Sequence, residues 1–582
     1  MEERCDARYF KLKRNRWIGR LSGCGHGVGA SGANSVAPMN TVQLAIHDLP
    51  FLTRQGFDVF DRRELLRVGA VGTLAAAGAA VARPASATAR DLSGYDWRAL
   101  AKALSPEASL YRPRDRDYWP LSIPFNHRYE ARRPAGIVAC ATTADVVAAI
   151  RWAGVVGMPV VPRSGLGHNY AGYSTTRGLL LNMSRMKAIT AAEGPRVRTR
   201  QYGPIRVGHD AGTVTVGAGV TNGDVHPLLE DEGIFVPTGR CPSVGVAGLV
   251  LGGGIGFSDK MFGMSCDRLL STTVVLADGR VVEASETSHP DLFWAVRGGA
   301  GNNYGVHTSF TFGYDQFAGN VAFYSFKWRI DDVQPVMAAM QEIAGQTIDD
   351  KRFHCRLGIG TVGQNPHDIK NNANVNVIGQ HYGTVKELRG ILAPLLQIGT
   401  TEECDKNRDS ICEVTPGRAA EKLSATTPVE RFAAKSAILP PDALLDDAQV
   451  KDAAELLKAW PGSANPDGAG FAMFGMGGRI NQIAPDATAF VHRGAAFILC
   501  AETTWSDRDR ASVVRANLAW LEDFYDAIFP FGPPQHSYQN FPDPLLHDWR
   551  TAYYGQNYDR LVTVKRDYDP NGFFTYPQAI GT

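Results

Sequence analysis

The chain has 582 residues, of which 44% are hydrophobic and 20% are charged, and its formal net charge is +1. This is the composition of a globular protein, and the length exceeds what one hydrophobic core needs, so we expect two domains. The balanced charge gives no reason to expect a nucleic-acid partner or an anionic membrane surface.

An export signal is predicted near the start of the chain. Arg62 and Arg63 are followed by an apolar, Ala-rich stretch over residues 68–81 and by an Ala-x-Ala site at 85–87. This pattern is typical of twin-arginine signals and predicts an exported, periplasmic or extracellular protein. The apolar stretch is too short to span a bilayer, so no membrane anchoring is expected after cleavage near Thr88. The alternative is an Ala-rich surface helix.

The next part of the chain alternates strand and helix patterns. Apolar runs predict strands over residues 136–140, 158–161, 179–182 and 213–217, with a helix that Thr143 caps and that ends before Gly157. Residues 272–283 predict a β-hairpin around the turn Asp278-Gly279. This beginning is α/β in character.

From about residue 317 the pattern changes. Strands are expected over 322–328, 374–379, 471–476 and 495–501, and amphipathic helices over 333–343 and 450–459. We interpret this part as an antiparallel sheet with helices covering one face, which makes the whole chain α+β. The polar loop 461–469 is expected at the surface.

The most unusual stretch is an apolar run over residues 236–267 with recurring glycines: Gly239, Gly245, Gly248, Gly252, Gly253, Gly254 and Gly256. Glycine is costly in ordinary elements because it loses the most backbone entropy. So many glycines indicate that something flat or anionic lies against bare backbone, whose N–H groups form anion sites. The alternative is a glycine-rich turn between buried strands.

A second loop, residues 162–174, follows a predicted strand and offers a cation, a hydroxyl, glycines and a ring nitrogen: Arg163, Ser164, Gly165, Gly167, His168 and Asn169. Such groups can cradle a pyrophosphate, and the histidine can serve as a nucleophile or a ligand. Neither loop has the spacing of a P-loop or of a Gly-x-Gly-x-x-Gly fingerprint. No paired Cys/His spacing accompanies His168 and Cys241, which excludes a zinc site of the common kinds.

These two loops resemble those of the berberine-bridge-enzyme-like flavoproteins, whose FAD-binding domain is of the vanillyl-alcohol-oxidase or PCMH type, with two α/β subdomains. In that family an Arg-x-Gly-Gly-His loop binds the FAD pyrophosphate, and its histidine is bonded to the flavin 8α-methyl group. The cysteine of a Gly-x-Cys-x-x-Val-Gly run is bonded to flavin C6. His168 and Cys241 occupy these positions, so the resemblance implies FAD bound covalently through both. Leu166 makes the first loop one residue longer than the family pattern.

Segments 537–543, 553–561 and 564–578 resemble further blocks of the family, so the similarity runs from about Tyr118 to Ile580. The resemblance assigns Tyr554 and Asn557 to the cofactor site. Composition and the twin-arginine pattern predict a disordered or over-extended start at 1–60 and the signal at 61–89. The resemblance then implies an FAD domain at 90–316, a substrate domain at 317–525, and a C-terminal segment at 526–582 that returns to the FAD domain.

The resemblance implies an oxidase that transfers a hydride from a C–OH group of a small-molecule substrate to FAD and reduces O2 to H2O2. Tyr538 matches the family's tyrosine base, although its pKa near ~10 would have to be lowered, and Glu502 is the second candidate. Val244 stands three residues after Cys241, where valine accompanies oxidases and leucine accompanies dehydrogenases in the family. A flavin dehydrogenase, an amine or alkaloid oxidase, and a non-catalytic flavin-carrying binding protein are the alternatives.

Overall fold

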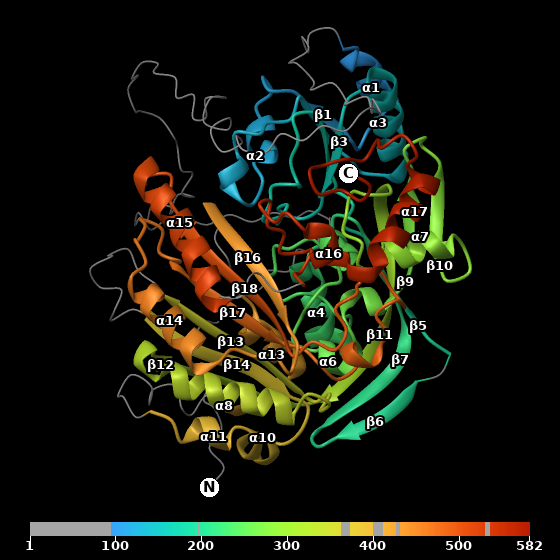
Figure 1. Ribbon diagram of the computed structural model, residues 1–582. Helices are drawn as coiled ribbons and strands as arrows, with labels where there is room; N and C mark the ends of the chain where they lie inside the picture. Colours follow the sequence, from blue (N-terminus) through green and yellow to red (C-terminus); the bar gives the residue numbers. More distant parts are fainter. Residues whose placement is uncertain (1–94, 196, 362–372, 400–410, 426–430, 530–535) are drawn as a thin grey trace, which may run out of the picture. The chain divides into compact units, whose positions relative to one another are not determined.

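The computed structural model describes residues 95–582 except 196, 362–372, 400–410, 426–430 and 530–535. The predicted export signal therefore lies outside the described residues. Residues 91–582 form one compact unit, and its described part contains three β-sheets (Figure 1). No helix in that part of the chain is long and apolar enough to cross a bilayer.

The first sheet has the strand order β1-β2-β4-β3, in which β2, β4 and β3 run parallel. Its strands are β1 (Ser109–Tyr111), β2 (Gly136–Ala139), β3 (Val160–Arg163) and β4 (Leu179–Asn182), and α1 (Trp97–Ala103) and α2 (Tyr118–Ser122) precede β2. Helix α3 (Thr143–Val156) connects β2 to β3, which confirms the predicted strand–helix–strand start.

Two boundaries in this region differ from the prediction. The N-cap of α3 is Thr142 and not Thr143, because the Thr142 hydroxyl accepts from the Asp145 N–H while the Asp145 carboxylate accepts from the Thr142 N–H. The helix ends as predicted at Gly157, whose φ of 66° suits a residue without a Cβ. Strand β3 both begins and ends two residues later than expected, and Arg163 is its last residue.

The second sheet is antiparallel, in the order β10-β9-β11-β7-β5 with β6 paired to β7 and β8 paired to β11. Its strands are β5 (Ile189–Glu193), β6 (Arg198–Tyr202), β7 (Ile205–Gly217), β8 (Ile234–Phe235), β9 (Leu269–Val275), β10 (Val281–Ser285) and β11 (Val306–Gly319). The predicted hairpin is confirmed as β9–β10. Its connection spans residues 276–280, and only Gly279 in it has a positive φ.

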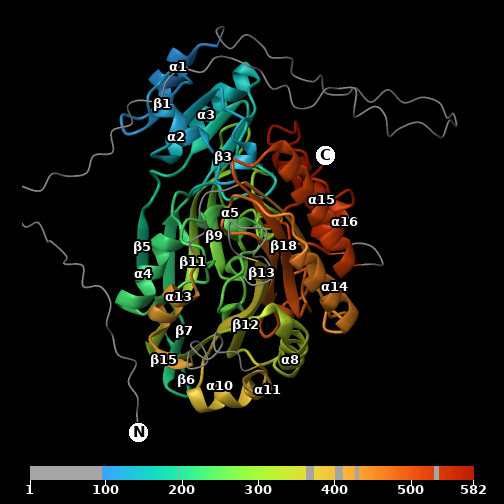
Figure 2. The ribbon, with the colours of Figure 1, turned by 90° about the vertical axis from the view of Figure 1, so that its left-hand side faces the viewer.

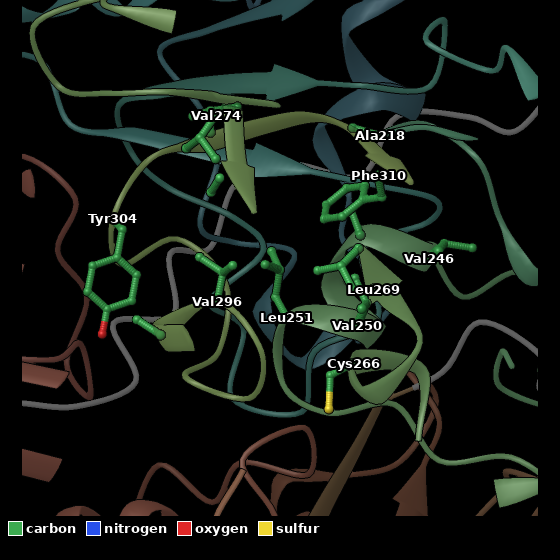
Figure 3. Close-up of a cluster of buried hydrophobic side chains, with 14 of the residues drawn as sticks. Ala218, Val246, Val250, Leu251, Cys266, Leu269, Val274, Val296, Tyr304 and Phe310 are labelled. Carbon is green, nitrogen blue, oxygen red and sulfur yellow. The ribbon is translucent and has the colours of Figure 1, made fainter. Parts of the chain in front are cut away.

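Short helices pack around the second sheet: α4 (Asn222–Glu232), α5 (Val246–Leu251), α6 (Asp259–Phe262) and α7 (Pro290–Ala295). Figure 3 shows Val250 and Leu251 of α5 in one buried cluster with Leu269 and Phe310 of the sheet. This packing fixes the helix that follows Gly245, and with it the glycine run at both of its ends.

The third sheet is entirely antiparallel, in the order β15-β12-β14-β13-β17-β18-β16. Its strands are β12 (Val321–Arg329), β13 (Phe353–Thr361), β14 (Ala373–His381), β15 (Cys412–Val414), β16 (Arg431–Leu439), β17 (Ala469–Gly475) and β18 (Phe497–Trp505). Helices α8 (Val333–Gln346), α14 (Asp447–Lys458) and α15 (Ala511–Ile528) cover one face (Figures 1 and 2). The sheet covered by helices on one face is therefore confirmed. Helices α10 (Val385–Ile391), α11 (Ala393–Leu396) and α13 (Pro416–Leu423) lie in its connections.

The loop 461–469 was expected at the surface, and this prediction is wrong for most of it. Gly462, Ser463 and Asn465 are buried. The Asn517 amide donates to the Gly462 carbonyl at 2.9 Å, and Asp509 accepts from Ser463 Oγ at 3.0 Å. Because these side chains satisfy the loop's polar groups, the polar sequence is buried without penalty.

The C-terminal segment contains α16 (Trp549–Tyr554) and α17 (Tyr558–Tyr568). Lys565 is buried, and its ammonium group donates to Asp569 at 2.6 Å, to the Phe574 carbonyl at 2.7 Å and to the Asn303 carbonyl. This bonding ties the end of the chain to the glycine loop at residues 297–305.

Candidate active site

The histidine loop, residues 164–174, begins at the carboxyl end of β3, which is where ligands bind in open α/β sheets. The Arg163 guanidinium donates to the backbone carbonyls of Ser174 at 2.9 Å and Ile123 at 3.0 Å. Asn169 Oδ1 accepts from two backbone N–H groups of the same loop. Both residues line the cavity described below, but they use these polar atoms to shape the loop.

His168 is held on both sides. Its ring stacks on Phe125 with 3.5 Å between the centroids, and its Nε2 lies 2.8 Å from Ser243 Oγ. Burial lowers the pKa of His168 to about 3, so the imidazole is neutral at physiological pH. A neutral ring nitrogen keeps the lone pair that a nucleophile needs.

The histidine loop and the glycine run touch each other directly. A Cβ on Gly165 would lie 2.7 Å from both the N–H nitrogen of Gly245 and the carbonyl oxygen of Ser243. The extra residue Leu166 is 50% exposed. The insertion is therefore accommodated on the outside of the loop, while His168 reaches Ser243 on the inside.

Most positions of the run must be glycine because neighbouring protein atoms occupy the space that a Cβ would need. This corrects the expectation that these glycines leave the backbone bare for a ligand. Asn540 lies where a side chain on Gly252 would be, Met264 and Phe490 block Gly253, and Ser265 blocks Gly254. Gly248 has no atom within 4 Å of its would-be Cβ, is exposed, and lines the cavity. Gly248 is thus the position in the run that leaves room for a ligand.

One cavity of about 330 Å³ joins the two loops to the uncovered face of the third sheet, a volume within the usual range for small-molecule sites. The opposite wall is supplied by β13, β17 and β18, which lie side by side in the third sheet (Figure 1). The predicted residues that line it are Arg163, Ser164, Gly167, His168, Asn169, Gly239, Cys241, Val244, Gly245, Gly248, Gly256, Glu502, Tyr538 and Tyr554.

The predicted residues outside that lining are Gly165, Gly252, Gly253, Gly254 and Asn557. For Asn557 the structure gives a different role: its amide donates to the carbonyls of Pro485 at 2.7 Å and Thr488 at 3.2 Å. It therefore stabilises a loop instead of contacting the cavity. Tyr554 does face the cavity, and its hydroxyl lies 3.4 Å from the Gly299 carbonyl.

Glu502 projects from β18 into the cavity. It has no hydrogen-bond or ion-pair partner among the described residues, and its side chain is open to the cavity space. The surrounding protein raises its pKa through desolvation, while Arg356 and Arg240 oppose that rise. A carboxylate with a raised pKa and free oxygens has the properties of a general base.

Tyr538 lines the cavity but is only 1% exposed. Its hydroxyl oxygen accepts from the Gly254 N–H at 2.9 Å and from the Asn540 amide at 3.1 Å. Burial raises the pKa of Tyr538, although these two donors oppose the rise. The lowered pKa that a tyrosine base would need is therefore not found.

Several cavity residues were not singled out from the sequence. Buried polar atoms without a partner among the described residues belong to Tyr173, Asn222, Asn302, Gln539 and Gln578. Unpaired buried polar atoms are costly, so their clustering around one cavity fits a large polar ligand such as FAD. Asn302 lies in the glycine loop at residues 297–305, and Gln578 lies in the last block of the resemblance, so both positions have a local sequence signal.

Comparison with known proteins agrees with this site. The model of the FAD-binding domain matches residues 134–285, and the berberine and berberine-like model matches residues 537–581. The chain is 30% identical to the uncharacterized FAD-linked oxidoreductase YgaK of Bacillus subtilis (strain 168), over 77% of this chain and 91% of that protein. It is also 30% identical to the xylooligosaccharide oxidase of Thermothelomyces thermophilus, over 78% of this chain and 89% of that protein.

A solved structure shares the fold. The glucooligosaccharide oxidase of Acremonium strictum, which has a 6-S-cysteinyl, 8α-N1-histidyl FAD, superposes with a TM-score of 0.69 at 23% identity. The match covers 83% of this chain and 98% of that one.

Proposed function

Because the chain belongs to the berberine-like family of FAD-linked oxidoreductases, we propose that it is an oxidase of hydroxyl-bearing carbons in sugars, oligosaccharides or secondary alcohols. FAD is its cofactor, and the cavity has the polar groups to hold it. One observation carries the proposal: the neutral His168 and Cys241 line the same cavity as the unpaired carboxylate of Glu502.

His168 and Cys241 are proposed to hold the flavin covalently. An unprotonated imidazole and a thiolate are the nucleophiles able to attack an electron-poor ring. The contact between their loops fixes both, since His168 Nε2 lies 2.8 Å from the hydroxyl of Ser243, two residues after Cys241. Asn222 fixes the cysteine from the other side by donating to the Cys241 carbonyl at 3.0 Å.

Held by the two loops, FAD would supply the hydride acceptor for the substrate carbon and the route for the electrons to O2. Glu502 is proposed to accept the hydroxyl proton of the substrate, because its carboxylate is the candidate base that is open to the cavity. Tyr538 is proposed to position the glycine run through the Gly254 N–H. Tyr170 also lines the cavity near Glu502. Its pKa is raised by burial and by the nearby Cys500 and Glu502.

Val244 supports the oxidase over a dehydrogenase. Its side chain lines the cavity, and its backbone is fixed by hydrogen bonds to Cys241 at 3.2 Å and Asn222 at 2.9 Å. Close-packed walls leave few voids, so a small side chain at a fixed position preserves space for a molecule as small as O2.

The domain roles and the export route are part of the proposal. Residues 90–316 and 526–582 are assigned to FAD and residues 317–525 to the substrate, because cavity residues come from all three segments. Arg62 and Arg63, with the apolar stretch after them, support export by the twin-arginine route.

The test is rapid anaerobic mixing of the purified yellow protein with a panel of sugars, oligosaccharides and secondary alcohols, followed by air. The proposal expects flavin bleaching by at least one hydroxyl compound and then one H2O2 per flavin on re-oxidation. A flavin that no compound reduces would favour a non-catalytic flavin carrier, and a reduced flavin that persists in air would identify a dehydrogenase.

A further inference from the structure

The substrate side of the cavity contains more positive than negative charge. Arg356 on β13 and Glu502 on β18 line this cavity, and Arg240 reaches it from the loop that carries Cys241. Two guanidinium groups against one carboxylate leave one uncompensated positive charge among these three groups.

The sheet register explains why Arg356 and Glu502 face the same space. Arg356 pairs with Phe474 on β17, and Gly470, four residues before Phe474, pairs with Glu502 on β18. Because side chains alternate along a strand, residues an even number of positions apart project from one face. Helices cover the opposite face, so both charges are directed into the cavity.

The cations are held in place but are not neutralised. Arg356 Nη1 donates to Asn376 Oδ1 at 2.9 Å, while its buried Nε has no partner. The Arg356 guanidinium lies 5.6 Å from the Phe474 ring centroid, and that of Arg240 lies 5.9 Å from the Phe257 ring centroid. Among the described residues neither arginine forms an ion pair with Glu502 or with any other carboxylate.

An enclosed, unpaired guanidinium is energetically unfavourable, because desolvation removes water without supplying an anion. Burial lowers the pKa of Arg356 to about 9, and the like charge of Arg240 acts in the same direction. An anion brought into this space would relieve both effects. The planar fork of arginine suits a carboxylate.

We propose that the substrate is an acidic one: a sugar or other hydroxylated compound whose carboxylate is bound by Arg240 and Arg356 while its hydroxyl is presented to Glu502. This assignment rests on the proposed function, since it names the substrate class of the same site. The aromatic walls Phe432 and Phe474 provide apolar surface for the body of such a substrate.

The experiment compares two matched sugars that differ only in having a carboxylate or a CH2OH group, galacturonic acid and galactose, and their dimers. For each sugar, binding to the holoenzyme is measured by calorimetry and flavin reduction by anaerobic mixing. The acid is expected to bind about 10- to 100-fold more tightly, as for a charged hydrogen bond. Raising the salt concentration should weaken binding of the acid and leave binding of the neutral sugar unchanged.

Arg240→Gln and Arg356→Gln are each expected to weaken binding of the acid by about tenfold or more relative to binding of the neutral sugar, so that most of the preference for the acid is lost. Arg389→Gln is the control, because Arg389 is exposed on α10 and does not line the cavity. If either variant fails to fold, the salt dependence of the wild-type protein decides the matter alone.

The outcomes separate the two proposals. Equal or tighter binding of the neutral sugar, or failure of the acid to bind, would overturn the acidic-substrate assignment while leaving the oxidase proposal standing. Tight, salt-sensitive binding of the acid without any flavin reduction by the wider panel would support the assignment and count against the oxidase proposal.

Discussion

Replacing Glu502 by glutamine removes the proposed base at almost constant shape. The carboxylate has no hydrogen-bond partner among the described residues, so the amide breaks no contact, and the free energy of unfolding should change by less than about 0.5 kcal/mol. Loss of a general base slows the chemical step by about 10²- to 10⁴-fold, which corresponds to ~3 to 5 kcal/mol. The measurement is the anaerobic rate of flavin reduction by a reactive substrate, followed by absorbance.

The direction of the Glu502 pKa shift also predicts the pH dependence. Because the folded-state pKa is raised, protonation of Glu502 stabilises the fold at acid pH, and this contribution is lost as the pH rises through the folded pKa. Glu502→Gln should therefore be at least as stable as the wild type at neutral pH. The wild-type kcat/KM should rise with pH through this raised pKa, and the variant should lack that limb.

Tyr538→Phe is the matched comparison. It deprives the Gly254 N–H and the Asn540 amide of their acceptor, which should cost about 1–3 kcal/mol of stability and lower Tm. The rate of flavin reduction should fall by less than about tenfold, in line with a positioning role. If Tyr538→Phe instead loses the rate by 10²-fold or more while Glu502→Gln reduces its flavin normally, the assignment of the base to Glu502 is refuted.

Three further changes test other parts of the account. Val244→Leu adds a larger side chain to the cavity wall at a position whose backbone is fixed by hydrogen bonds. It should slow re-oxidation of the flavin by air about tenfold or more while leaving anaerobic reduction nearly unchanged. Equal small losses in both half-reactions would indicate a packing role only. Cys241→Ala should retain FAD on His168, with altered absorbance, so flavin released by acid from this variant would contradict the histidyl bond. Arg62→Lys combined with Arg63→Lys should trap the precursor in the cytoplasm, and unaffected secretion would argue against the twin-arginine route.

Local sequence was enough to predict the two loops. Within each loop the glycines and the nucleophile are close in sequence, and the nucleophiles of the two loops, His168 and Cys241, line one cavity. Their motif did not show what each glycine contacts: Gly252 is opposite Asn540, nearly 300 residues away in sequence. The same limit applied to Asn557, whose partners at Pro485 and Thr488 are tertiary neighbours.

The third sheet was predicted in kind but not in full. Strand β13 contains two glycines, and β16 is rich in alanine and carries an arginine and a lysine; these residues have a low strand preference. The strands form because neighbours pair with β13 on both sides and with β16 along one edge. The sequence predicted a strand over residues 495–501, which overlaps β18, but it did not show which face of the sheet the helices cover. The position of the helices leaves the other face of the sheet open, and this places Glu502 in the cavity.

The central claim is that this cavity holds FAD through His168 and Cys241, and peptide mass measurement tests it most directly. The purified protein is precipitated in acid, digested, and searched for peptides carrying flavin. The account predicts a yellow precipitate and one flavin mass joined to both the His168 and the Cys241 peptide. All of the FAD in the acid supernatant, with both peptides unmodified, would contradict it.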